Sequence, residues 1–236
     1  MNDPRQINIS NEFWGLVFNC ELNISNLGKG PLNVGDMRMY VTLDKGKPNQ
    51  SRILIGRKYI PFDKTEIRSL GYFTVKPGES WSGSVYLSEE LTEEQEVKRS
   101  LLYEEIFEQI QKSYLNDKSK INAGRRLVYE ASDKELKSVN EFMEEHVSWL
   151  ERGNYKILLF IKKASNSHKF ILRKGYRFTL NEAQLKGIKL LQPQSYKYPA
   201  MVPDNLFFTY KATPTIQELP IEESSNLIKE YEQIMK

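Results

Sequence analysis

The sequence predicts a mainly β protein with helices: an antiparallel β-sandwich that carries a helical insertion and a C-terminal helix. Apolar and polar residues alternate through much of the first 87 residues and again after residue 152, which is the period of half-buried strands. A helical period replaces it in residues 88–151 and returns in residues 222–235. Strands interrupted by helices favour one sheet-based domain with an insertion. The predicted units are a β-sandwich of residues 12–87 and 152–190, a helical insertion of residues 88–151, and a Pro-rich loop with a C-terminal helix in residues 191–236.

The first clear strand spans residues 15–26, in which alternate residues form one apolar face: Leu16, Phe18, Cys20, Leu22 and Ile24. The stretch "SNLGKGPLNVGD" at residues 25–36 overlaps its end. Gly30 and Gly35 in this stretch have the spacing of a phosphate-binding loop. However, Asp36 and Met37 stand where such a loop needs lysine and then serine or threonine. We therefore expect a structural hairpin connection between two strands.

The strand after this loop changes its side-chain phase. Leu32 and Val34 share one parity, whereas Met37 and the apolar residues after it share the other. A slip of one residue would turn an apolar set to the wrong face, so this pattern predicts a β-bulge at Gly35–Asp36. Further strands are expected at residues 53–55, 69–75, 81–87, 153–163 and 169–180, the last of them broken at Gly175.

Two helices are predicted in the insertion. Residues 92–115 have apolar side chains at helical spacing, with Leu101 beside that stripe, and Thr92 with Gln95 matches a capping box. Asp133 can cap a second helix that ends at about Leu150. Residues 181–191 favour either a short helix or an irregular strand.

The composition is that of a globular protein, with 236 residues, 39% of them hydrophobic and 28% charged. No window approaches the eighteen apolar residues that a membrane-spanning helix needs. The start, "MNDPRQINIS", lacks the features of a signal peptide. One hypothesis is that the native chain has a signal or anchor upstream, which would make these residues the soluble part of a membrane-anchored or envelope protein. The compartment stays unknown.

Three segments resemble the strand–turn phrases of immunoglobulin-like and fibronectin-like sandwiches: "VFNCELNISNLGKGPLNV", "VKPGESWSGSVYL" and "GNYKILLFI". In such domains a "PGE" turn often precedes a strand, and "G-x-Y" often opens a late strand. The resemblance covers about residues 12–87 and 152–180, and it implies an immunoglobulin-like β-sandwich. The chain departs from antibody-type domains because it lacks their Cys…Trp…Cys signature and carries the insertion. Such folds host many functions, so the resemblance assigns none.

Charge is distributed unevenly along the chain. The insertion holds nine basic and sixteen acidic residues, whereas residues 152–199 hold eleven basic residues and one acidic residue. We expect the acidic insertion to lie against the basic strands. One alternative is that the basic face binds a partner protein. Another is that it binds nucleic acid or an anionic membrane surface. The candidate binding residues on this face are Lys162, Lys163, Lys169, Arg173, Lys174 and Arg177.

Few residues suggest chemistry. Cys20 is the only cysteine, so no internal disulfide can form, and burial as a small apolar side chain is expected. His146 lies on the apolar face of the second predicted helix, where a partly buried, hydrogen-bonded histidine is expected. "EEH" at residues 144–146 lacks the second histidine of a zinc-binding HExxH motif. We therefore predict no catalytic residue, metal site or cofactor.

These observations favour a non-enzymatic interaction domain, whose insertion helices and basic strands bind a partner that is most simply a protein. Its oligomeric state is not defined. The alternative is an enzyme or small-molecule-binding protein with a pocket between the insertion and the sheet. In that case His146, Glu145 and Tyr129 would line the pocket.

Overall fold

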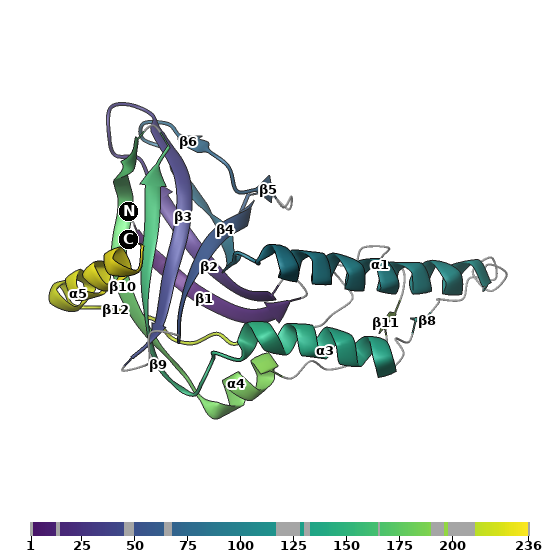
Figure 1. Ribbon diagram of the computed structural model, residues 1–236. Helices are drawn as coiled ribbons and strands as arrows, with labels where there is room; N and C mark the ends of the chain where they lie inside the picture. The colour runs from purple at the N-terminus through teal and green to yellow at the C-terminus, as the bar shows by residue number, and fades with distance from the viewer. Residues whose placement is uncertain are drawn as a thin grey trace.

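Most of the described chain belongs to one antiparallel sheet, from which two helices project and on which two others pack (Figure 1). The computed structural model describes residues 2–12, 15–44, 50–63, 68–116, 128–129, 133–164, 166–189, 196–197 and 211–235. The strands of the sheet are β1 (Asn2–Glu12), β2 (Gly15–Ser25), β3 (Leu32–Leu43), β4 (Ser51–Pro61), β5 (Arg68–Ser69), β6 (Phe73–Val75), β7 (Ser80–Glu89), β9 (Gly153–Lys163), β10 (Asn166–Leu180) and β12 (Gln217–Glu218). Their order is β1-β2-β7-β4-β3-β9-β10-β12, with β5 beside β4 and β6 beside β3.

The sheet curls into a half-barrel, so the predicted mainly β fold with helices is confirmed, but the described strands do not form the two packed sheets of a sandwich. Phe18 of β2 and Phe178 of β10 meet inside the curl with ring centroids 6.3 Å apart. The segment 212–218 bonds to both edges, because Ile9 N donates to Ala212 O at 2.8 Å while β12 pairs with β10. Alternating apolar residues are common to a curled sheet and to a sandwich. This is why the pattern did not distinguish them.

The core fills the inner face of the curl. Its largest fully buried side chains include Phe18, Met37, Met39 and Tyr155. Trp149 and Leu150, just beyond helix α3 (Asp133–Val147), and the buried residues of helix α4 (Glu182–Lys189) belong to the same core. The short helix at residues 182–189 resolves the alternative left open by the sequence, and Asn181 and Gln184 form its capping box.

The connection between β2 and β3 is a structural turn, as predicted, but it is not a hairpin. β2 pairs with β1 and β7, whereas β3 pairs with β4, β6 and β9. Asn26 holds the turn, since its Nδ2 donates to Gly30 O at 2.8 Å and to Val75 O at 2.9 Å. The hairpin prediction was wrong because alternation identifies strands but not their neighbours.

The β-bulge at Gly35–Asp36 is confirmed. Val34 pairs with Lys163 and Met37 with Ile161, so β3 carries one extra residue between these pairs. Val34 and Met37 are both fully buried as a result. A Cβ on Gly35 would lie 3.0 Å from the Ala164 Cα, which explains why glycine occupies this close approach.

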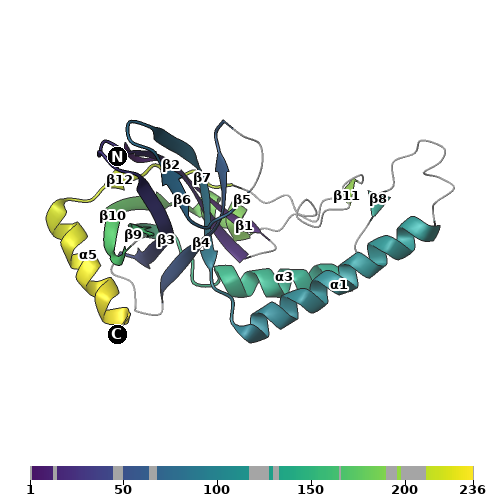
Figure 2. The same ribbon diagram turned by 90° about the horizontal axis from the view of Figure 1, so that it is seen from above.

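The helical insertion forms an arm that projects from the sheet (Figures 1 and 2). Its described elements are α1 (Glu93–Asn116), α3 and the short strand β8 (Val128–Tyr129). β11 (Tyr196–Lys197), from the later Pro-rich segment, pairs with β8. The predicted capping box is confirmed, because Thr92 N donates to Gln95 Oε1 at 2.9 Å and Gln95 N donates to Thr92 Oγ1 at 3.2 Å. The predicted cap at Asp133 rests on a side chain outside the described part.

The C-terminal helix α5 (Ile221–Ile234) packs on the outer face of the sheet. There Tyr231 and Leu227 form a second core with Tyr40, Leu158 and Phe160. β10 runs without interruption past Gly175, so the predicted break was wrong. A Cβ on Gly175 would lie 2.7 Å from Ser224 Oγ, so this glycine allows α5 to approach the sheet.

Candidate interaction surface

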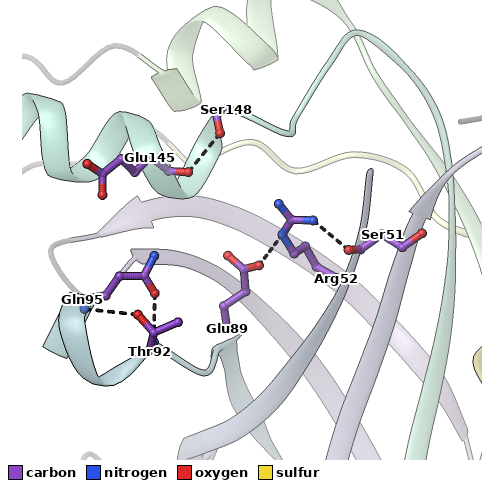
Figure 3. Close-up of polar contacts among 7 residues, drawn as sticks. All are labelled: Ser51, Arg52, Glu89, Thr92, Gln95, Glu145 and Ser148. Carbon is purple, nitrogen blue, oxygen red and sulfur yellow. Dashed lines mark hydrogen bonds and ion pairs between the residues drawn. The ribbon is translucent and has the colours of Figure 1, made fainter. Parts of the chain in front are cut away.

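The arm is anchored to the sheet by a charged pair at its base (Figure 3). Glu89 ends β7 just before α1, and its Oε1 lies 2.6 Å from Arg52 Nε of β4. The Arg52 guanidinium also lies 5.3 Å from the centroid of the Trp149 ring, just beyond α3. Burial raises the pKa of Glu89, and Arg52 opposes that rise. One arginine thus links both ends of the insertion to the sheet.

The two helices of the arm pair through their facing sides. Lys98 Nζ lies 2.6 Å from Glu145 Oε1, and Lys134 Nζ lies 3.5 Å from Glu105 Oε1. Arg99 pairs with Glu96 within α1. Lys98, Arg99 and Lys134 thus pair with acids of the arm itself, and the expected pairing of the insertion with the basic strands is not what these contacts show.

One flank of α1, beside these pairs, is exposed to solvent. Val97 and Leu101 are 54% and 61% exposed, although both are large apolar side chains. Glu94, Glu104 and Glu108 are exposed at intervals of three and four residues from them, so the five residues form one stripe on the helix. We call this the acidic–apolar flank. Sequence reasoning placed Leu101 beside the packing stripe, and it missed the flank because the position of α3 was not known.

Tyr129 is not brought together with His146 and Glu145. His146 is in the last turn of α3, whereas Tyr129 in β8 precedes the first turn. A helix of 15 residues separates them by roughly 20 Å. Glu145 is engaged with Lys98. Among the described residues, no group of three or more His, Cys, Asp or Glu side chains could hold a metal ion.

His146 is buried, as predicted, with its ring 4.7 Å from that of Phe142. Its Nε2 has no hydrogen-bond partner within the described part of the chain, which departs from the hydrogen-bonded histidine that we expected. Burial lowers the pKa of His146 below 6.5. Lys98 and Arg99 act in the same direction, and Glu145 opposes them. The imidazole is therefore a neutral component of the arm near neutral pH.

This burial predicts a pH dependence. The unfolded chain takes up a proton at His146 near pH 6.5, whereas the folded protein resists it. The stability due to neutral His146 is therefore complete above pH 6.5 and is lost as the pH falls through the lower folded pKa. We expect acidification to lower the free energy of unfolding by at most about 1.4 kcal/mol per pH unit from this group. Denaturant unfolding at several pH values measures this dependence. In His146→Leu the free energy of unfolding should fall less steeply with acidification than in the parent protein, and an equal fall in both proteins would contradict the role of His146.

The basic strands face the C-terminal segment. Arg173 pairs with Glu232 of α5, and Lys174 Nζ lies 3.0 Å from Glu218 Oε1 of β12. Arg177 Nε donates to Gln217 Oε1 at 3.2 Å. Lys162 and Lys163 lie at the end of β9, away from these pairs, and the side chain of Lys169 is outside the described part. Three of the six candidate residues therefore contact the C-terminal segment, and two others lie at the end of β9.

A pocket of about 300 Å³ lies where α1 meets the sheet. The sequence-based alternative expected a pocket in this region, but with different residues. The observed lining is Val17, Arg57, Lys58, Tyr86, Ser88, Glu89, Leu91, Glu96 and Arg99. Its acids Glu89 and Glu96 are paired with arginines, so the pocket offers no uncompensated carboxylate.

Cys20 is fully buried in the core, as expected. Burial raises the pKa of its thiol far above the ordinary value, so Cys20 is not a thiolate nucleophile. Among the described helices, none is both long and apolar enough to cross a membrane.

Comparison with known proteins adds no relative. No protein-family model, no curated protein and no solved structure matches this chain. The fold is a curled antiparallel sheet with a projecting helical arm.

Proposed function

We propose that this chain is a non-enzymatic interaction domain, whose arm binds a basic amphipathic helix of a partner protein. The acidic–apolar flank of α1 is the observation that supports this function. Val97 and Leu101 are adjacent on one helix face and more than half exposed, and a partner helix could cover them through its own apolar side chains.

The charge of the flank defines the partner's chemistry. Glu94, Glu104 and Glu108 surround the apolar pair, and among the described residues only Glu108 of the three has a cation at ion-pair distance, with Lys112 Nζ at 3.4 Å. Lysines or arginines beside the apolar face of the partner would complement these acids. Exposed ion pairs contribute little affinity each, so their role is orientation and rapid association, while Leu101 supplies the contact energy.

The flank suits this role better than the basic strands. Arg173 and Lys174 already pair with acids of the C-terminal segment. Binding through them would require a partner to displace those acids, whereas the flank needs no rearrangement of the described structure.

A labelled peptide of leucine and lysine heptads provides the test, with binding followed by fluorescence anisotropy. We expect Leu101→Glu to weaken binding about tenfold or more, because it places a charge at the centre of the apolar contact. Leu27→Glu is the matched control, since Leu27 is 89% exposed in the β2–β3 turn. Equal affinity of Leu101→Glu and the parent protein, or equal loss in Leu27→Glu, would refute the proposal. Lys162→Glu with Lys163→Glu should leave binding intact.

A further inference from the structure

A pocket of about 570 Å³ lies on the outer face of the sheet beside α5. Its floor is formed by outward-facing residues of β9 and β10, because Tyr155, Ile157, Tyr176 and Phe178 point into the core on the opposite face. The outward residues are Asn154, Lys156, Arg177 and Thr179. The walls are Asp44 after β3, residues 213–217, and Glu223 in the first turn of α5.

Two cations stand side by side on this floor. Lys156 and Arg177 are directly opposite each other in the β9–β10 register. Like charges in this position repel, so each needs compensation. Lys156 receives it from two acids, because its Nζ lies 3.2 Å from Asp44 Oδ1 and 3.3 Å from Glu223 Oε2.

Arg177 is not compensated in the same way. Its Nε donates to the neutral Gln217, and within the described residues no carboxylate lies at ion-pair distance from it. The side chain is exposed, which leaves the terminal N–H groups of the guanidinium accessible from the pocket. Such a fork matches a carboxylate through two parallel hydrogen bonds.

The opposite side of the pocket has a surplus of negative charge. Asp44 and Glu223 together carry two negative charges against the single positive charge of Lys156. Asp44 follows β3 and Arg177 belongs to β10, with β9 between them. Two strand spacings separate these sides by roughly 10 Å. The pocket is therefore dipolar and has no net charge.

We propose that this pocket binds a small zwitterion of the amino-acid class. The ligand carboxylate binds the Arg177 guanidinium, and its ammonium group faces Asp44 and Glu223. Asn154 and Thr179, whose side chains are joined by a hydrogen bond of 2.7 Å, provide polar contacts beneath the ligand. This site is independent of the arm, so either proposal can fail without the other.

Calorimetric titration of the whole chain with γ-aminobutyrate and glycine tests the proposal, with propionate and propylammonium as single-charge controls. We expect saturable binding of at least one zwitterion, about tenfold or more tighter than either control. Arg177→Gln and Glu223→Gln should each weaken it about tenfold, and both keep a polar side chain at an accessible position. Arg68→Gln, on β5 away from the pocket, should bind normally.

Three results would overturn this assignment. The first is the absence of saturable binding for both zwitterions. The second is propionate binding as tightly as the zwitterions, which would indicate a simple carboxylate site. The third is unchanged affinity in Arg177→Gln.

Discussion

Replacing Phe18 with alanine is expected to lower the free energy of unfolding by about 3–5 kcal/mol. Phe18 is fully buried in β2, and its ring packs across the curl against Phe178 of β10. Removal of the ring loses its transfer free energy and leaves a cavity that a rigid curled sheet cannot fill. Denaturant unfolding of the two proteins measures this difference.

The matched control for this substitution is Phe62→Ala. Phe62 is 50% exposed, so its replacement should change stability by no more than about 0.5 kcal/mol. Combining Phe18→Ala with Phe178→Ala then tests the contact itself. We expect a coupling of about 0.5–1.5 kcal/mol. Additive effects would indicate that β2 and β10 do not meet inside the curl.

The second large effect is expected at the C-terminal helix. Tyr231 is 9% exposed, and its ring lies 4.4 Å from Phe160 and 5.8 Å from Tyr40. Tyr231→Ala should cost about 2–4 kcal/mol and loosen α5 from the sheet. Ile234→Ala is the control in the same helix. Ile234 is 49% exposed, so its replacement should change the free energy of unfolding little.

Tyr40 reports whether α5 has detached. Burial, together with the nearby Glu230 carboxylate, raises the pKa of Tyr40 to about 12, and its hydroxyl donates to Glu230 Oε1 at 2.6 Å. If Tyr231→Ala releases α5, Tyr40 should ionise closer to the ordinary value of 10. NMR titration of labelled tyrosine measures this shift. An unchanged Tyr40 pKa with unchanged stability would show that the second core does not hold the helix.

Features set by neighbouring residues could be predicted from the sequence. The capping box of Thr92 and Gln95 depends on residues three apart, and the bulge at Gly35 follows from a local change of parity. β1 was missed because its buried side chains include only two residues of the alternating apolar pattern, Ile7 and Ile9. The order of strands could not be predicted, since pairing depends on contacts between distant segments.

The same distinction applies to the candidate surfaces. The sequence predicts that the acidic insertion compensates the basic strands, but net charge does not identify the segment that supplies the acids. Lys156 and Arg173 pair with Glu223 and Glu232 of α5, not with the insertion. The exposure of Leu101 also depends on which side of α1 is covered by α3. Helical spacing alone does not contain that information.

The central claim is that α1 binds its partner through the acidic–apolar flank, and cross-linking tests it position by position. A photoreactive residue is placed in turn at Val97, Leu101 and Glu104 on the flank, then at Lys98 and Leu102 on the side near α3, and finally at Lys162. We predict that the leucine–lysine peptide cross-links at the flank positions, with the yield falling at Lys98 and Leu102. Equal yields around the helix, or the highest yield at Lys162, would contradict the claim.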